Sequence, residues 1–182
     1  MKKSLVSLTL ISLVSANSFA LELYKAKVIS HKEWTTGDIK ASFNPGKSNM
    51  SKLKNKTSST NTDSTYADVE AATTFTMGQV GAMVNLAGRH QMYVSNNTQS
   101  TQKYFYQFTL CANVSDNLQQ CANYYDVLEI EAGGYAYASI EPELQLIFSK
   151  AGNYPVYAST YLASEDSSLQ DGANSTSVIQ IS

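Results

Sequence analysis

Short segments of alternating apolar and polar residues run through the second half of this chain, and they constrain its fold more than any other feature. Between residues 104 and 112, Tyr104, Tyr106, Phe108, Leu110 and Ala112 share one face of a strand, and Gln107, Thr109 and Cys111 share the other, a period of two that is typical of a half-buried β-strand. Similar segments occupy residues 124–131, 135–140, 144–148, 154–162 and 176–181, with turn-forming residues between them. This spacing predicts an all-β fold, an antiparallel β-sandwich.

Residues 66–92 fit two kinds of secondary structure. Val84 and Leu86 match the alternation of a strand, but with the apolar residues before them they also match one face of a helix. Residues 66–72 are compatible with a short helix. Strand is the favoured interpretation for this segment.

The segment from Phe148 to Val156 reads Phe-Ser-Lys-Ala-Gly-Asn-Tyr-Pro-Val. It resembles the Ala-Gly-x-Tyr-x-Val start of the penultimate strand in immunoglobulin-like and related bacterial extracellular sandwiches. The resemblance implies an immunoglobulin-like β-sandwich in which Tyr154 has a structural role as the tyrosine corner, its hydroxyl tying the preceding loop to the strand. Pro155 departs from the pattern because it lacks a backbone donor, so we expect the strand to start later or to contain a bulge.

The two cysteines, Cys111 and Cys121, flank a turn-like segment. In an exported protein such a pair predicts one disulfide, here closing a hairpin. A redox-active pair usually needs a Cys-x-x-Cys motif at a helix start, which the sequence lacks. We therefore predict a structural disulfide bond.

The first twenty residues read as a secretory signal peptide. Lys2 and Lys3 precede an apolar run from Leu5 to Val14, and small residues flank Phe19 at the expected cleavage site after Ala20. The mature protein is then secreted or periplasmic, and the signal peptide looks bacterial. Beyond this segment the sequence has no apolar run of about 18 residues, so no membrane-spanning helix is predicted.

The next segments predict an extension before the sandwich. Residues 21–45 alternate on both sides of a turn-like Thr-Thr-Gly-Asp at 35–38, which predicts an N-terminal β-hairpin. Residues 46–65 include sixteen Ser, Thr, Asn or Lys among twenty, which predicts a polar flexible linker or a long loop. The β-sandwich domain is then expected over residues 66–182.

Charge is distributed unevenly along the chain. Residues 21–60 carry eight lysines and three acidic residues, a net charge of +5, whereas residues 61–182 carry three basic and twelve acidic residues, a net charge of −9. The basic part either meets an anionic partner or is simply solvated against its own acidic domain, and the second reading is favoured. Nucleic acid is not expected as a partner, because the chain is exported and has a single arginine.

No motif in the sequence points to an enzyme. The two histidines, His31 and His90, are far apart, and a Gly-x-Ser-x-Gly motif is absent. Glu129 and Glu131 lie two apart, which suits a glycosidase pair but equally suits the exposed face of a strand. We predict no catalytic residues, no cofactor and no metal.

Tyrosines are the most suggestive functional feature, since ten of the twelve lie between residues 93 and 161. A tyrosine ring with few rotors suits sugar or protein recognition, although tyrosine is also common on half-buried sheets. The lone tryptophan sits beside the predicted hairpin turn, where it either anchors a partner or docks the hairpin on the sandwich. The candidate binding residues are Trp34, Lys25, Lys27, Lys40, Tyr157 and Tyr161.

Together these features favour an exported, non-enzymatic bacterial protein that binds a surface glycan or a protein. One alternative is a structural or assembly component of the bacterial envelope, which self-associates by donating strands from residues 21–44 to a neighbour. A small secreted effector is the other alternative.

Overall fold

The structure is a computed structural model that describes residues 20–35, 41–44, 65–73, 76–115 and 118–182. All the regular secondary structure in these ranges is β, so the predicted all-β fold is confirmed. The strands are β1 (Ala20–Thr35), β2 (Ala41–Asn44), β3 (Tyr66–Thr73), β4 (Thr76–Gly78), β5 (Met83–Ser95), β6 (Gln102–Ser115), β7 (Leu118–Ile147), β8 (Gly152–Ser164) and β9 (Gln170–Ile181). Strand, the favoured interpretation of residues 66–92, is found at 66–73, 76–78 and 83–92. Within the described ranges no helix is long and apolar enough to cross a membrane.

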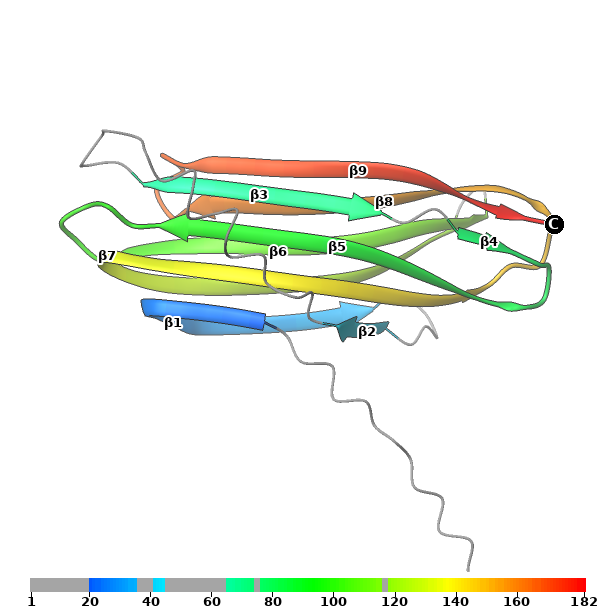
Figure 1. Ribbon diagram of the computed structural model, residues 1–182, viewed down its shortest axis with the longest axis horizontal. Helices are drawn as coiled ribbons and strands as arrows, with labels where there is room; N and C mark the ends of the chain where they lie inside the picture. The colour runs from blue at the N-terminus through cyan, green and yellow to red at the C-terminus, as the bar shows by residue number, and fades with distance from the viewer. Residues whose placement is uncertain (1–19, 36–40, 45–64, 74–75, 116–117) are drawn as a thin grey trace, which may run out of the picture.

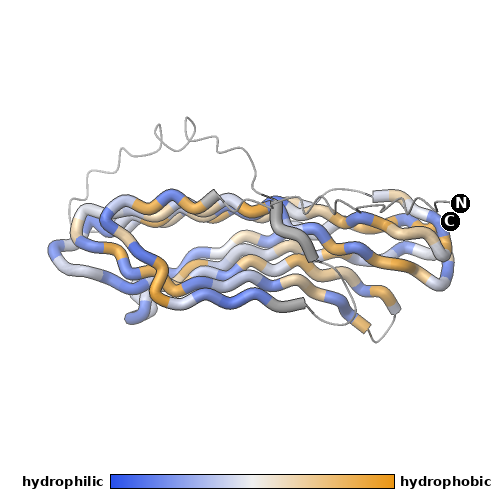
Figure 2. Tube along the Cα trace, turned by 90° about the horizontal axis from the view of Figure 1, so that it is seen from below, coloured by the Kyte–Doolittle hydropathy of each residue, from blue (hydrophilic) through white to orange (hydrophobic). Residues whose placement is uncertain are grey.

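The strands form one hydrogen-bonded sheet that folds over into two layers (Figures 1 and 2). The first layer contains β3, β5 and residues 135–147 of β7, and the second contains residues 118–130 of β7, β6, β8, β9 and β4. β7 belongs to both layers because its chain folds back between Ile130 and Tyr135, where Gly133 has a positive φ of 70°. The double glycine at 133 and 134 is therefore the point where the sheet changes layer.

The predicted N-terminal hairpin is wrong, because β1 and β2 each pair with β7 and not with each other. β1 follows β7 antiparallel from Ser139 to Ala122 and changes layer with it at Lys25, whose φ is 50°. Pairing with the long edge of β7 satisfies more backbone groups than a hairpin of two short strands would. Residues 36–38 of the turn expected at 35–38, and most of the predicted linker, residues 46–64, lie outside the described residues.

The place where β1 and β7 bend together requires glycine at position 134. A Cβ atom built on Gly134 would lie 2.7 Å from the carbonyl oxygen of Tyr24 and 2.8 Å from that of Lys25. Both distances are shorter than real Cβ contacts, so any larger residue would push β1 away from β7. This close approach fixes how the N-terminal strand crosses from one layer to the other.

Apolar side chains that point between the layers form two core clusters along the length of the molecule. Tyr104, Tyr106 and Phe108 are buried, as the alternation predicted. The first cluster contains Val69, Met92, Val94, Tyr104, Tyr106, Phe108, Tyr124, Leu128, Ile130, Ala136, Ala138, Ile140 and Leu162. The second contains Val84, Leu86, Leu110, Ala112, Ala122, Leu144, Leu146, Phe148, Val156, Ala158, Ile179 and Ile181.

A cross-link and a corner contact fix the second layer. Cys111 on β6 and Cys121 on β7 are directly opposite and form a disulfide, with their Cα atoms 4.1 Å apart. The hydroxyl of Tyr154, at the start of β8, donates to the carbonyl oxygen of Lys150 at 2.8 Å. Pro155 lies inside β8, and the strand neither starts later nor contains the bulge that we expected. Because β8 pairs with β6 only from Val156 onwards, the backbone N–H that Pro155 lacks is not needed for that pairing.

Candidate functional site

The outer face of the second layer gathers aromatic, amide and hydroxyl side chains from three neighbouring strands. Successive side chains of a strand point to opposite faces, and Tyr106, Phe108 and Leu162 point into the core. The residues between them therefore point outward, away from the first layer. We call this surface the tyrosine face; it consists of Gln107 and Thr109 on β6, Asn123 and Tyr125 on β7, and Tyr157, Ser159 and Tyr161 on β8.

The strand register places these side chains in rows across the sheet. Gln107 lies directly between Tyr125 and Tyr161, so an amide separates two rings. In the next row Thr109 is opposite both Asn123 and Ser159. In the third row, Tyr157 is opposite Cys111, so its ring lies beside the disulfide.

Hydrogen bonds hold the polar groups of the tyrosine face in fixed orientations. The Gln107 amide nitrogen donates to Thr109 Oγ1 at 3.1 Å, and Thr109 Oγ1 donates to Asn123 Oδ1 at 2.9 Å. Tyr157 and Tyr161 are 38% and 46% exposed, respectively. The face therefore combines accessible rings with the preoriented amide of Gln107, whereas Asn123 is buried beneath this surface at 8% exposure.

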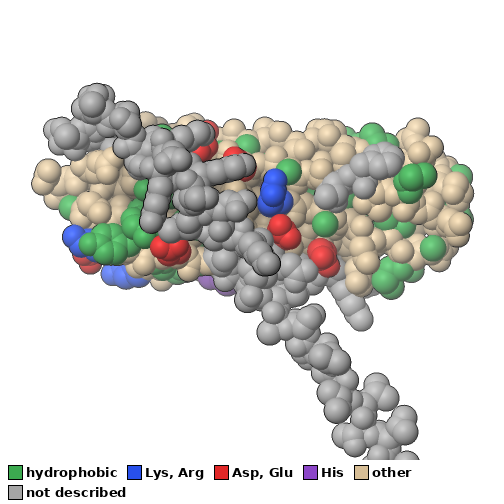
Figure 3. Space-filling model, in the orientation of Figure 1, with side chains coloured by type: hydrophobic (Ala, Val, Ile, Leu, Met, Phe, Trp, Pro, Cys, Tyr) green, Lys and Arg blue, Asp and Glu red, His purple; other side chains and the backbone are tan. Residues whose placement is uncertain are grey.

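The centre of the tyrosine face is uncharged, and the charged groups lie at its margins. Lys27 on β1 forms an ion pair with Glu129 at 2.7 Å, and this hydrogen bond and charge raise the pKa of Lys27. Lys103 pairs with Glu165 at 3.6 Å, and Lys32 lies opposite Tyr125 on the edge strand. The opposite side of the molecule, formed by β3, β5 and the second half of β7, shows acidic and basic side chains (Figure 3).

The structure brings together some of the predicted binding residues. Tyr157 and Tyr161 share the tyrosine face, and Lys27 lies at its margin. Lys25 lies apart, at the bend of β1, where its ammonium group is 5.6 Å from the centre of the Tyr24 ring. Periodicity alone could have placed Tyr157 and Tyr161 on one face, because they are four residues apart on one strand.

Two other predicted residues cannot be assigned to this surface. The backbone of Trp34 pairs with Asn123, a member of the tyrosine face, but its side chain lies outside the description. Lys40 lies outside the described residues. Sequence reasoning missed Gln107 and Asn123, because only the register of β6 against β7 and β8 shows that they adjoin the tyrosines.

A second group of tyrosines crosses the first layer, but its rings contact one another. The ring centres of Tyr66 and Tyr93 are 6.1 Å apart, those of Tyr93 and Tyr135 are 6.0 Å apart, and those of Tyr135 and Tyr24 are 5.5 Å apart. The Tyr135 hydroxyl donates to Glu22 at 2.9 Å, and this hydrogen bond raises the pKa of Tyr135. Because these rings pack against each other, their faces are less available to a ligand than those of Tyr157 and Tyr161.

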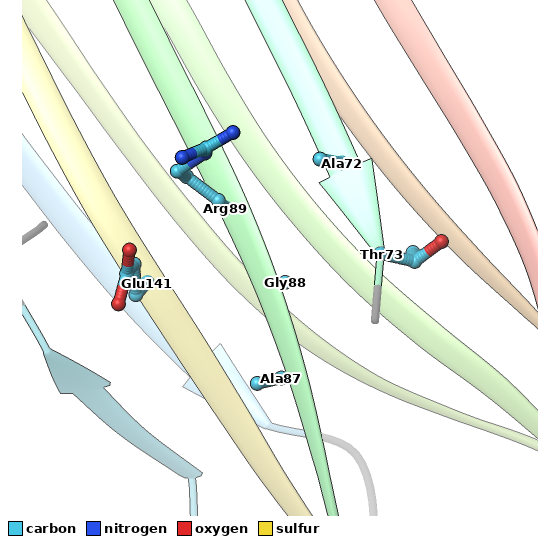
Figure 4. Close-up of a pocket in the computed structure, with 6 residues that line it drawn as sticks. All are labelled: Ala72, Thr73, Ala87, Gly88, Arg89 and Glu141. Atoms are coloured by element: carbon cyan, nitrogen blue, oxygen red, sulfur yellow. The ribbon is translucent and has the colours of Figure 1, made fainter. Parts of the chain in front are cut away.

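A hollow of about 330 Å³ lies in the first layer, where β3 ends beside β5 (Figure 4). Glu141 and Arg89 lie on one side of it, and Ala72 and Thr73 lie on the other. None of the predicted binding residues lines this hollow. Its complete lining is Ala72, Thr73, Ala87, Gly88, Arg89 and Glu141.

No protein-family model and no curated protein matches this chain. Among solved structures, it is similar to a CARDB domain from Pyrococcus furiosus, with 11% identity over 68% of this chain and 95% of that one and a TM-score of 0.31. It is also similar to a PapD-like domain of human CEP192 (8% identity, 62% and 82% covered, TM-score 0.26) and to the bacterial hydrophobin BslA (14% identity, 64% and 95% covered, TM-score 0.27). These scores are too low to assign a family or a function.

Proposed function

We propose that this chain is an exported, non-enzymatic bacterial binding protein whose tyrosine face recognises a neutral glycan. The observation that carries the proposal is the uncharged surface on which exposed tyrosine rings lie beside amide and hydroxyl groups that are already oriented. The export part of the proposal depends on the signal-peptide pattern of residues 1–20.

The chemistry of the tyrosine face fits a sugar ring. A pyranose has apolar C–H faces, which stack on aromatic rings, and a rim of hydroxyl groups, which need paired donors and acceptors. Tyr161 supplies a ring, and Gln107, which is opposite Tyr161 on β6, supplies an amide group beside it. Few of these groups lose rotational freedom on binding, because a hydrogen bond already holds the amide.

The lack of charge at the centre favours a neutral glycan over the other partners considered. An anionic polysaccharide or nucleic acid would need unpaired cations, yet Lys27 and Lys103 are paired with carboxylates. The centres of protein interfaces are enriched in Arg and Met as well as aromatic residues, and the tyrosine face contains neither. Binding of a protein instead of a glycan is therefore an outcome for the test and not the proposal.

The scaffold that we propose for this surface is an immunoglobulin-like β-sandwich. Its support is the two-layer arrangement and the bond from the Tyr154 hydroxyl to the Lys150 carbonyl oxygen, which is the geometry of a tyrosine corner. The parallel pairing of the short β4 with the last strand, β9, gives that layer a further edge strand.

The test begins with an array of neutral and charged oligosaccharides, followed by calorimetric titration of the best neutral ligand. We expect Tyr161→Ala and Tyr157→Ala each to weaken binding by about tenfold or more, because an aromatic anchor is worth over about 1 kcal/mol. Both side chains are partly exposed, so circular dichroism and thermal stability should stay close to wild type.

Tyr24→Ala is the matched control, since Tyr24 is a half-exposed tyrosine on β1 that lies off the tyrosine face. It should leave glycan binding unchanged. Unaltered affinity in both tyrosine-face variants would show that the surface is assigned wrongly. Binding only to charged glycans, or only to a protein, would overturn the proposed ligand class.

A further inference from the structure

A buried carboxylate at the open edge of the sandwich is held by three side chains. Asp126 on β7 is 1% exposed. It lies in the second layer, opposite Tyr106 of the first core cluster. The hydroxyls of Tyr106 and Tyr124 donate to its Oδ2 at 2.6 and 2.7 Å. Nδ1 of His31, which is opposite Asp126 on β1, lies 2.7 Å from Oδ1.

These contacts fix the orientation of the His31 ring. Burial raises the pKa of Tyr106 and Tyr124, so both remain protonated donors and the oxygens of Asp126 act as acceptors. With Oδ1 accepting from Nδ1–H, the other ring nitrogen, Nε2, is directed away from Asp126. The ring also packs edge-on against Tyr124, with their centres 4.9 Å apart, and the side chain is 48% exposed.

Glu33 points to the same side of β1 as His31, because the two residues are separated by one position. Its Oε1 lies 3.4 Å from His31 Nε2, and its side chain is 46% exposed. A charged hydrogen bond would bring the two atoms to about 2.7–2.9 Å. By contrast, two ligand atoms bound at about 2.0–2.1 Å around a tetrahedral zinc ion lie about 3.3–3.4 Å apart.

We propose that His31 Nε2 and the Glu33 carboxylate bind a borderline divalent cation of the Zn²⁺ and Cu²⁺ class, with Asp126 as the buried group that orients His31. A carboxylate that accepts from the second nitrogen of a ligating histidine is a regular feature of such sites. An imidazole ligand favours Zn²⁺ and Cu²⁺ over Ca²⁺ and Mg²⁺, which prefer oxygen.

The proposed site has an open coordination sphere. Within the described residues, no three His, Cys, Asp or Glu side chains gather as a set that could hold a metal ion, so water completes the sphere around the two protein ligands. The site is separate from the tyrosine face, because it lies on the inward side of β1 and β7 at the edge of the sandwich. It also departs from the sequence-based expectation of no metal.

The test is calorimetric titration of the full chain with ZnCl₂ near neutral pH, and MgCl₂ and CaCl₂ are titrated in parallel. We expect one Zn²⁺ per chain and no response to the other two ions. His31→Gln should abolish binding, and Glu33→Gln should weaken it by about tenfold. Asp126→Asn should weaken it by roughly 10–100-fold although it removes no ligand, because an amide allows the imidazole to bind in the wrong tautomer.

Glu22→Gln is the matched control, because Glu22 is on the same strand but hydrogen bonds to Tyr135. It should bind Zn²⁺ as the wild type does. Since Asp126 is buried, its variant is also checked by circular dichroism, and the half-exposed His31 and Glu33 keep the test valid if that variant unfolds. Equal zinc affinity in wild type and His31→Gln, no binding at millimolar zinc, or tighter binding of Ca²⁺ would overturn the proposal.

Discussion

The two histidines of this chain differ in exposure and in their neighbours, and these differences determine what each imidazole can do. His31 is half-exposed between two carboxylates, whereas His90 is completely buried. His90 Nδ1 is 2.9 Å from the Thr160 hydroxyl, and its ring stacks on Phe108 with centres 5.3 Å apart. Thr160 donates to the Glu70 carbonyl oxygen, so the Thr160 oxygen accepts from Nδ1–H of His90.

Burial of His90 predicts an acid-sensitive fold. Loss of solvation lowers the pKa of His90 from 6.5 to about 4, so the unfolded chain takes up a proton before the folded chain does. The stability contributed by the neutral ring is therefore present above about pH 6.5 and is lost as the pH falls towards 4, by roughly 3 kcal/mol in all. In urea unfolding between pH 4 and 7, His90→Gln should show a shallower pH dependence than wild type. Parallel pH profiles would show that His90 does not cause the effect.

Individual buried polar residues are what sequence patterns predict least well. Asp126 lies on the inward face of its strand, the same face as the core residues Tyr124 and Leu128. Alternation predicts an apolar residue at this position. Three hydrogen-bonding side chains, from β1, β6 and β7, offset the cost of burying the carboxylate there. One of them, His31, is 95 positions away from Asp126 in the sequence, so no local pattern indicates this contact.

Strands themselves were predicted better than their partners. The segments around residues 104–112 and 154–162 are strands as expected, since their alternation is a local property. The choice of partner for residues 20–35 is not local: they pair with β7, which begins more than eighty residues later. The two strands expected from residues 124–140 are joined into β7, and the double glycine between them is a bend shared with β1.

The bend shared by β1 and β7 predicts a specific cost for a methyl group. Gly134→Ala places a Cβ against the carbonyl oxygens of Tyr24 and Lys25, so β1 must move outward. We expect a loss of about 1–3 kcal/mol in the free energy of unfolding and faster amide exchange in β1, because overpacking is relieved by backbone shifts. Gly172→Ala is the control, since its Cβ would meet nothing closer than 3.6 Å. Equal stability of the two variants would contradict this close approach.

At the scale of the whole molecule, β1 closes an edge in both layers. It pairs with the first-layer and second-layer halves of β7, and it supplies the His31 contact to Asp126. β1 itself carries Lys25, Lys27 and Lys32, and its pairing with β7 has two register irregularities. Lysines and bulges on an edge strand oppose pairing with another chain. We therefore expect the intact molecule to keep β1 on its own β7 and not to donate it to a neighbouring chain.

Removing β1 should convert this molecule into one that self-associates. A variant lacking residues 1–35 leaves β7 without its partner from Ala122 to Ser139, and an unpaired edge of that length recruits other strands. Size-exclusion chromatography with light scattering should then show oligomers, whereas we expect the full chain to stay monomeric at every concentration. A synthetic peptide of residues 20–35 added in trans should restore the monomer, and a scrambled peptide of the same composition should not. Concentration-dependent oligomers of the intact chain would instead revive strand donation, because only exchange of β1 between copies would then explain both results.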